Sequence, residues 1–169
     1  MLCVVDENNI IESLVNVDRS TNPNWKEYYP WNKVGEVYTD VKPLEYAKEE
    51  KLKAVDAWTA DKITGGFIST ASGEAVTYDS DKDTQLTMQG IALNVNTALF
   101  AEKYPDGCPV RGYAEGASEK SIFMLNPEQV MLWCADLSVH IGNCKQAGWI
   151  KQAEVAAATT KEELESIVW

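Results

Sequence analysis

Short runs of apolar residues at the start of the chain predict β-strands. Leu2–Val5 and Ile10–Val17 are rich in β-branched and apolar residues, and the turn-forming segment Asp6–Asn9 lies between them. A further strand is predicted at Val34–Tyr38, where apolar residues again dominate. Residues 1–42 are therefore expected to form a small antiparallel β unit.

Three later segments carry apolar residues at steps of three and four, which is typical of amphipathic helices. The first, 43–62, begins at Pro43, a residue suited to the first helical turn. The second is predicted as one helix that follows the aspartates of Asp79–Asp83 and ends at Tyr104–Gly107. The third is the longest, and Asn126 fits its N-cap.

Glycines and a capping signature shape the end of the chain. Gly142 and Gly148 predict a break or kink in the longest helix. Thr160 and Glu163 have the spacing of a capping box that opens a last short helix. The buried stripe of the longest helix is expected to comprise Val130, Trp133, Cys134, Leu137, Ile141 and Cys144.

The expected fold class is α+β. It combines the β unit 1–42, which attaches or recognises, a linking helix at 43–58, and a domain at 59–169 of short hairpins packed on two long helices. No heptad pattern of apolar residues persists over three repeats, so a coiled-coil shaft is not expected. The hairpin strands are predicted at Phe67–Thr70 with Ala75–Tyr78, and at Val110–Tyr113 with Lys120–Met124.

Composition and charge exclude several classes of function. The 169 residues are 45% hydrophobic and 24% charged, as in an ordinary globular domain. Asp and Glu number 26 against 15 Lys and Arg, which gives a net charge of −11. This balance argues against nucleic-acid binding through a basic face and against adhesion to anionic membranes.

Neither a membrane span nor a signal peptide is expected. No stretch approaches the roughly 18 consecutive apolar residues of a transmembrane helix. The apolar start Met1–Val5 is stopped by Asp6, which predicts a cytosolic-type N-terminus. None of the cysteines lies in a CxxC pair, so free thiols are expected at Cys3, Cys108, Cys134 and Cys144.

Two groups of residues invite a metal or catalytic site, and we interpret both as structural. The Asp79–Asp83 run resembles the start of a calcium-binding loop, but Thr84 and Gly90 occupy the positions where such a loop needs glycine and glutamate. Asp81 or Asp83 is therefore expected to cap the next helix instead. His140 lies near Cys134, Asp136 and Cys144 in the sequence, but their orientation is uncertain and no matching ligand pair occurs elsewhere. Since no hydrolase, zincin or phosphate-binding motif is present, we expect no enzyme, no metal and no cofactor.

An aromatic cluster is the best candidate for recognition. Trp25, Tyr28, Tyr29 and Trp31 follow a polar loop at Arg19–Asn24. Trp and Tyr are favoured at interfaces because they bury a large area and keep a polar group, and stacking on a sugar ring uses the same side chains. The alternative is that these four residues cover the thin core of the β unit.

Several motifs have the character of hairpins and helix caps, namely Asp61-Lys62-Ile63, Tyr78–Asp81 with Gln85, Phe123–Glu128 and the ending Ala156–Ile167. With these motifs, the chain from about Thr59 to its end resembles a domain of unknown function found in bacteriophage tail-fibre and tail-associated proteins. The start, Val4–Ile11, is similar to the opening hairpin of small phage tail proteins. The resemblance implies no catalytic residues.

The resemblance and the lack of catalytic motifs predict a non-enzymatic virion protein of the tail tip, baseplate or fibre, made in the host cytoplasm. It is expected to act by protein–protein docking and host-surface recognition. The expected partners are other tail or virion proteins and a host-surface component or host protein, and a homo-oligomer is permitted. Two alternatives stay open, a small acidic phage-encoded inhibitor of a host factor and a carbohydrate-binding module.

Overall fold

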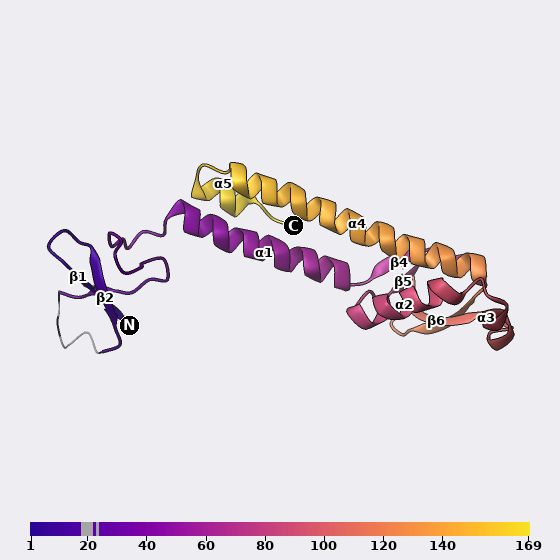
Figure 1. The fold of residues 1–169 in the computed structure, drawn as a ribbon. Coiled ribbons are helices and arrows are strands. Elements are labelled where there is room, and N and C mark those ends of the chain that lie inside the picture. Colours follow the sequence, from indigo (N-terminus) through magenta and orange to yellow (C-terminus); the bar gives the residue numbers. More distant parts are fainter. Residues whose placement is uncertain (18–21, 23) are drawn as a thin grey trace. The chain divides into compact units, whose positions relative to one another are not determined.

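The computed structural model describes residues 1–17, 22 and 24–169, and it confirms the α+β class (Figure 1). The predicted polar loop at Arg19–Asn24 lies outside the described residues, apart from Asn22 and Asn24. The elements are β1 (Leu2–Val5), β2 (Ile11–Val15), β3 (Lys26–Glu27), α1 (Leu44–Thr64), β4 (Phe67–Ser69), β5 (Val76–Tyr78), α2 (Lys82–Asn94), α3 (Ala98–Lys103), β6 (Cys108–Ala114), β7 (Ser121–Leu125), α4 (Pro127–Ala157) and α5 (Lys161–Ser166).

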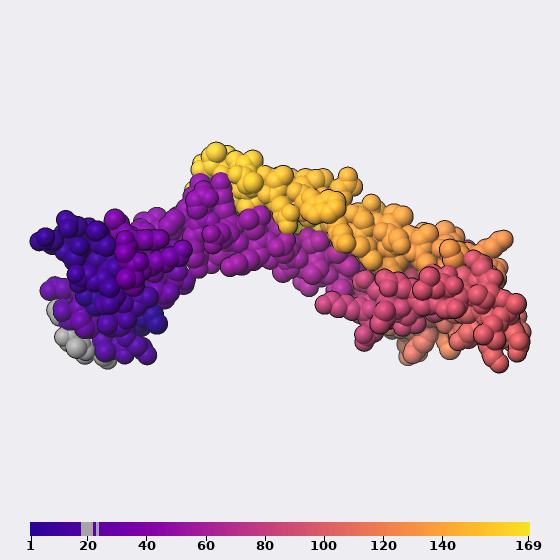
Figure 2. Space-filling view, in the orientation of Figure 1, coloured from indigo at the N-terminus to yellow at the C-terminus, as the bar shows by residue number. Residues whose placement is uncertain are grey.

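The chain divides into two compact units. One comprises Met1–Leu52 and Val155–Val168, and the other comprises Lys53–Glu154 and Trp169. In Figures 1 and 2 the first unit consists of the indigo and purple start and the yellow end of the chain. The domain boundaries expected near residues 42 and 59 stay a prediction, because compactness does not test which part folds alone.

The N-terminal hairpin forms as predicted. β1 is the central strand of a three-stranded sheet in the order β2-β1-β3. In the turn between β1 and β2, the carboxylate of Asp6 accepts hydrogen bonds from the backbone N–H groups of Asn8 and Ile10, at 2.9 and 2.8 Å. An aspartate that bonds its own following backbone in this way is a strong local turn signal.

The third strand of this sheet lies elsewhere than predicted. β3, at Lys26–Glu27, pairs with β1, so the prediction of a strand at Val34–Tyr38 is wrong. Val37 makes only a single bridge with Ile10. Gly35 has a φ of 88°, a left-handed conformation that turns the chain before Val37 and prevents an extended run.

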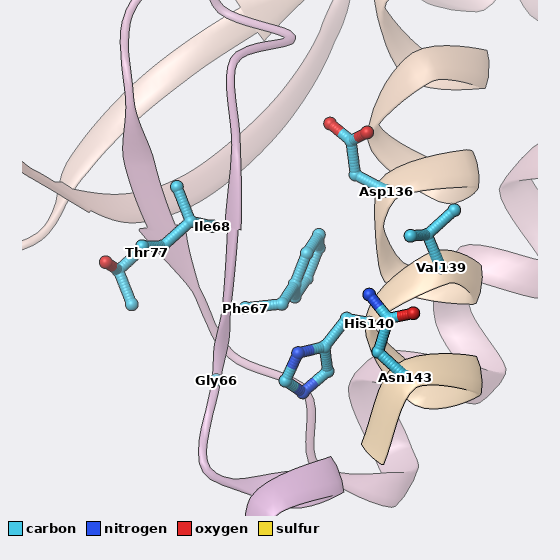
Figure 3. Close-up of a pocket in the computed structure, with 8 residues that line it drawn as sticks. All are labelled: Gly66, Phe67, Ile68, Thr77, Asp136, Val139, His140 and Asn143. Atoms are coloured by element: carbon cyan, nitrogen blue, oxygen red, sulfur yellow. The ribbon is translucent and has the colours of Figure 1, made fainter. Parts of the chain in front are cut away.

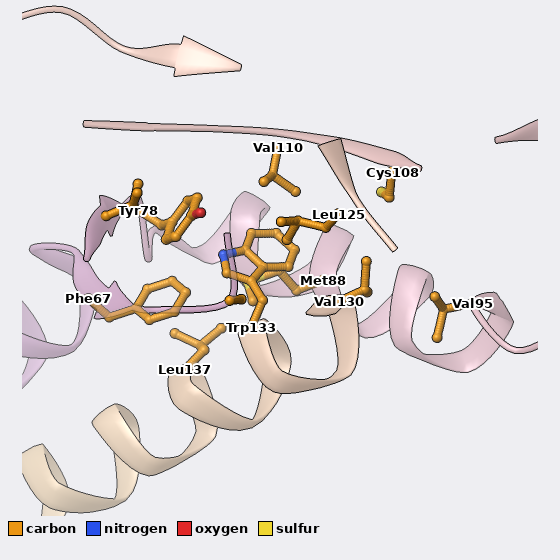
Figure 4. Packing of buried hydrophobic residues seen from close by; sticks show 12 residues of the cluster. Phe67, Tyr78, Met88, Val95, Cys108, Val110, Leu125, Val130, Trp133 and Leu137 are labelled. Carbon is orange, nitrogen blue, oxygen red and sulfur yellow. The ribbon is translucent and has the colours of Figure 1, made fainter. Parts of the chain in front are cut away.

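The second unit contains a four-stranded antiparallel sheet in the order β4-β5-β6-β7, which confirms both predicted hairpins. Its inward side chains form one core with α2 and α4, and Figure 4 shows Trp133 of α4 in the middle of this core. The Trp133 ring lies 5.6 Å from the ring of Tyr78 and 6.4 Å from that of Phe67. Of the predicted α4 stripe, Val130, Trp133 and Leu137 are buried, and Cys134, Ile141 and Cys144 are half-buried.

The single helix expected after the Asp79–Asp83 run is two helices, α2 and α3. The hydroxyl of Thr97 donates a hydrogen bond to the carbonyl of Asn94 at 2.8 Å and accepts one from the backbone N–H of Phe100 at 3.2 Å. The Thr97 side chain thus caps a new helix. Polar side chains that bond the nearby backbone compete with helix continuation, which explains why the apolar periodicity was not sufficient here.

The α4 helix is continuous through Gly142 and Gly148, so the expected break does not occur, and the alternative of a kink stays a prediction. Gly148 is buried, and a Cβ atom there would lie 2.4 Å from the hydroxyl oxygen of Thr59 on α1. Glycine at this position therefore permits the close approach of α1 and α4. At Gly142 a Cβ atom would have no neighbour within 4 Å among the residues that the structure describes.

Polar side chains close the N-termini of α4 and α5 as predicted. The Asn126 side chain accepts a hydrogen bond from the N–H of Gln129 at 3.0 Å, and the Gln129 side chain accepts one from the N–H of Asn126 at 2.9 Å. Thr160 and Glu163 form the predicted capping box of α5. Each cap satisfies backbone N–H groups that have no partner inside the helix.

Replacing the α4 cap by alanine should destabilise the protein. We expect Asn126→Ala to lower the free energy of unfolding by about 1 kcal/mol, because an N-cap side chain contributes roughly that amount. The measurement is urea-induced unfolding followed by circular dichroism. Gln89→Ala, on an exposed position of α2, is the control and should leave the midpoint unchanged. Equal midpoints for the two variants would contradict the role of the cap.

Acid should weaken the fold through Asp81, which caps α2 as predicted. Hydrogen bonds from the hydroxyl and N–H of Thr84 and from the N–H of Asp83 hold the pKa of Asp81 below its ordinary value. Because the pKa of Asp81 is lower in the folded state than in the unfolded state, the ionised carboxylate stabilises the fold at pH values above its unfolded pKa. This stabilisation is lost below about pH 4, as the pH falls through the pKa of the folded state.

The variant Asp81→Asn tests this pH dependence, because asparagine keeps a capping oxygen and does not titrate. Its melting temperature should fall less between neutral and acidic pH than that of the unchanged protein. The measurement is thermal unfolding at a series of pH values. Parallel declines in the two proteins would show that Asp81 does not contribute.

Candidate recognition site

The four aromatic residues of the predicted cluster flank β3. Trp25 immediately precedes this strand and Tyr28 immediately follows it, while Tyr29 and Trp31 lie in the loop beyond. All four residues are half-buried. They are therefore neither a fully exposed patch nor part of a closed core.

Tyr29 and Trp31 stack on each other. Their ring centroids are 4.8 Å apart and their planes differ by only 4°. Tyr46, in the first turn of α1, meets the Trp31 ring edge to face at 5.7 Å. The structure thus brings together two of the four predicted residues and joins them to Tyr46, which the sequence reasoning missed.

Lys42 places a positive charge beside these rings. Its ammonium nitrogen lies 5.8 Å from the centroid of the Trp31 ring and 6.0 Å from that of Tyr46, and it forms an ion pair with Glu50 at 2.6 Å. A cation near an aromatic face is attracted by the ring electrons. Lys42 and Tyr46 lie on either side of Pro43, the residue that indicates a helix start in the sequence. This position in the sequence could have indicated that the two side chains lie close together.

Trp31 is therefore held from several directions. Tyr29 covers one ring face, Tyr46 meets the ring, and the indole N–H donates a hydrogen bond to the carbonyl of Thr39 at 3.0 Å. This arrangement favours a structural role for Tyr29 and Trp31. Trp25 and Tyr28 lie outside the stack.

A second candidate site lies in the other unit, beside strand β4 and helix α4 (Figure 3). Figure 3 shows the side chains of Phe67 and His140 extending into the space between strand and helix, and their ring centroids are 6.3 Å apart. The cleft has a volume of about 540 Å³ and is lined by Gly66, Phe67, Ile68, Thr77, Asp136, Val139, His140 and Asn143.

His140, a residue of α4, contacts the C-terminal end of α1. Its Nε2 atom is 3.0 Å from the carbonyl oxygen of Lys62, and the hydroxyl of Ser80 donates a hydrogen bond to the carbonyl of Ile63 at 2.6 Å. Carbonyls in the last turn of a helix have no partner within that helix. His140 and Ser80 supply partners for two of them, which agrees with the structural interpretation of His140.

Asp136, which also lines this cleft, has a partner. Asp136 accepts a hydrogen bond from the hydroxyl of Ser69 at 2.6 Å. All four cysteines are free, as expected. Burial raises the pKa of the thiols of Cys108, Cys134 and Cys144, which keeps them protonated and weakly nucleophilic. Within the described residues, no three His, Cys, Asp or Glu side chains gather as a metal site would require.

One family model matches most of the chain. It is described as a domain of unknown function, DUF4376, and it covers residues 46–168. The chain belongs to the DUF4376 family. The DUF4376 region begins at Tyr46, the α1 residue that meets Trp31, and leaves the N-terminal sheet outside the match. No curated protein and no solved structure matches the chain significantly.

Among the described residues, no helix combines the length and the apolar character that crossing a bilayer demands.

Replacing His140 should destabilise the DUF4376 region. In His140→Ala the carbonyl of Lys62 loses its side-chain partner, and we expect the free energy of unfolding to fall by about 1 kcal/mol. His140→Gln retains a donor of similar reach and should recover part of the loss. Asn143→Ala, an exposed position that lines the same cleft, is the control. The measurement is denaturant unfolding.

The same variants separate structure from binding. A folded His140→Ala protein of normal stability would contradict the helix-end role, and loss of partner binding without loss of stability would assign His140 to a binding site.

Proposed function

We propose that this protein is a non-enzymatic virion protein of a bacteriophage tail, located at the tail tip, baseplate or fibre. It acts by docking to other tail proteins and by recognising the host surface. The proposal is supported by the resemblance of the DUF4376 region to tail-fibre and tail-associated proteins, a resemblance carried by motifs such as Phe123–Glu128.

The observation that carries this proposal is the position of the aromatic cluster relative to the family match. Residues 1–45 lie outside the DUF4376 match and include a three-stranded sheet. Trp25 and Tyr28 border β3 of this sheet, outside the Tyr29–Trp31 stack. A segment additional to the family domain, with aromatic side chains of the type that interfaces favour, suits attachment or recognition.

The engaged state of the polar groups supports a non-enzymatic role. His140 contacts a helix end, Asp136 is bonded to Ser69, and the half-buried thiols of Cys134 and Cys144 have raised pKa values. A nucleophile needs an adjacent base or a lowered pKa. His140 Nε2 lies 3.8 Å from the Sγ atom of Cys144, but the same nitrogen contacts the carbonyl of Lys62, and burial raises the pKa of this thiol. These groups serve packing and helix termination instead.

One alternative has an observation in its favour. The net charge of −11 suits a small acidic inhibitor that binds a host protein. A carbohydrate-binding module has less support, because Tyr29 already covers one face of Trp31 and the indole N–H is bonded to the backbone. Sugar stacking would depend on Trp25.

Mass spectrometry of purified virions tests the proposal. Peptides of this protein should be found at constant stoichiometry to known tail proteins after density-gradient purification and high-salt washing. Absence from virions, together with one host protein that co-purifies with the tagged chain at fixed stoichiometry, would favour the inhibitor. Quenching of tryptophan fluorescence by glycans would favour the carbohydrate-binding module.

Trp25→Ala should reduce incorporation into virions, or pull-down of tail proteins, several-fold, because truncating a central aromatic residue removes a large part of an interface. Trp169→Ala provides a matched tryptophan control in the other unit and should assemble normally. Both variants should keep the melting temperature of the unchanged protein. Normal incorporation of Trp25→Ala would remove this residue from the recognition surface.

A further inference from the structure

The outward side of α4 carries a continuous row of uncharged residues, which we call the outer seam. Its seven members follow one another at alternating steps of three and four residues, and all are exposed: Leu132, Ala135, Val139, Gly142, Gln146, Trp149 and Ala153. Leu132, Val139 and Trp149 are 46%, 61% and 63% exposed, high values for large apolar side chains. Figure 2 shows part of the α4 surface, in orange, with no other segment over it.

This spacing is that of a heptad repeat, and it persists over three heptads, with Gly142 and Gln146 in place of apolar residues at two of the seven positions. In the sequence it is hidden, because the buried stripe of the same helix, with Trp133 and Leu137, runs at similar steps on the opposite side. Because apolar residues lie on two faces of α4, the sequence alone does not show either repeat clearly. Only the observed exposure separates the stripe that faces the core from the seam that faces outward.

The outer seam and its borders carry little charge. None of the seven members is charged, and the positions that flank them include one acid, Asp136, one base, Lys145, and the exposed apolar residues Met131 and Ile150. The whole chain has a net charge of −11. Two copies that approach through most faces therefore repel each other, whereas two outer seams bring together equal numbers of acids and bases.

We propose that the outer seam binds the outer seam of a second copy of this chain, with the two α4 helices antiparallel. The seam extends for roughly 30 Å at the helical rise of 1.5 Å per residue, so an occupant needs a helix of the same length and repeat. An identical α4 meets this requirement and adds no like-charge contact.

Side-chain size favours the antiparallel orientation. With the axis near Cys144, Val139 of one copy lies level with Trp149 of the other, and Gly142 lies level with Gln146. Each larger side chain then meets a smaller one. Parallel helices would instead set Trp149 against Trp149 and Gly142 against Gly142, which crowds one layer and leaves a hole in another.

The test is sedimentation equilibrium of the purified full chain. The unchanged protein should have twice the chain mass of 18.8 kDa. Val139→Glu and Trp149→Lys should each raise the dimer dissociation constant about tenfold or more, since each buries an unpaired charge. The double variant should recover dimerisation, because Glu at 139 then lies beside Lys at 149 of the other copy in the antiparallel arrangement only.

Leu93→Glu is the matched control. It places the same charge at an 83% exposed leucine of α2, away from the outer seam, and should leave the dimer intact. Thermal unfolding by circular dichroism verifies that every variant is folded. A monomeric unchanged protein, a mass of three chains, dissociation by Leu93→Glu, or a double variant as weak as the single variants would each overturn the proposal. None of these outcomes depends on whether the protein is present in virions.

Discussion

The second unit depends on how the end of α1 is satisfied. Helix ends leave carbonyl groups without partners inside the helix. His140 of α4 contacts the carbonyl of Lys62, and Ser80, which follows β5, donates to that of Ile63. The buried hydroxyl of Ser80 also accepts a hydrogen bond from the N–H of Gly66 at 2.8 Å. The end of α1, the start of β4 and the register of α4 are thus fixed by one small set of polar contacts.

At the opposite end of α1, aromatic contacts and one ion pair surround the first turns. Tyr46 meets Trp31, Trp31 stacks on Tyr29, and Lys42 lies beside the rings while paired with Glu50. Since the family match begins at Tyr46, this residue is where the DUF4376 region meets a segment that is additional to it. The stack at this junction places the loop after β3 against the first turn of α1.

Local chemistry was readable from the sequence, and long-range pairing was not. The turn at Asp6, the N-cap at Asn126 and the capping box at Thr160 depend on residues within a few positions of each other, and all three were predicted. The partner of His140 lies 78 residues away. The true third strand, Lys26–Glu27, is too short to show alternation, and the positive φ of Gly35 is not evident from residue types. Of the candidate site, the residue types were predictable, but the division between stacked and unstacked members was not.

Gly142 and Gly148 of α4 show that the same residue type has a different structural role when it is exposed than when it is buried. Glycine within a helix is less favourable than alanine by about 1 kcal/mol. At Gly148 this cost is offset by the close packing of α4 against α1, because a Cβ atom there would collide with Thr59. At Gly142 the structure offers open space, so none of the described residues requires glycine at this position. A glycine in the middle of an uncharged, exposed heptad row suits the approach of another helix, since it lets a larger side chain such as Gln146 of a second copy fill the same layer.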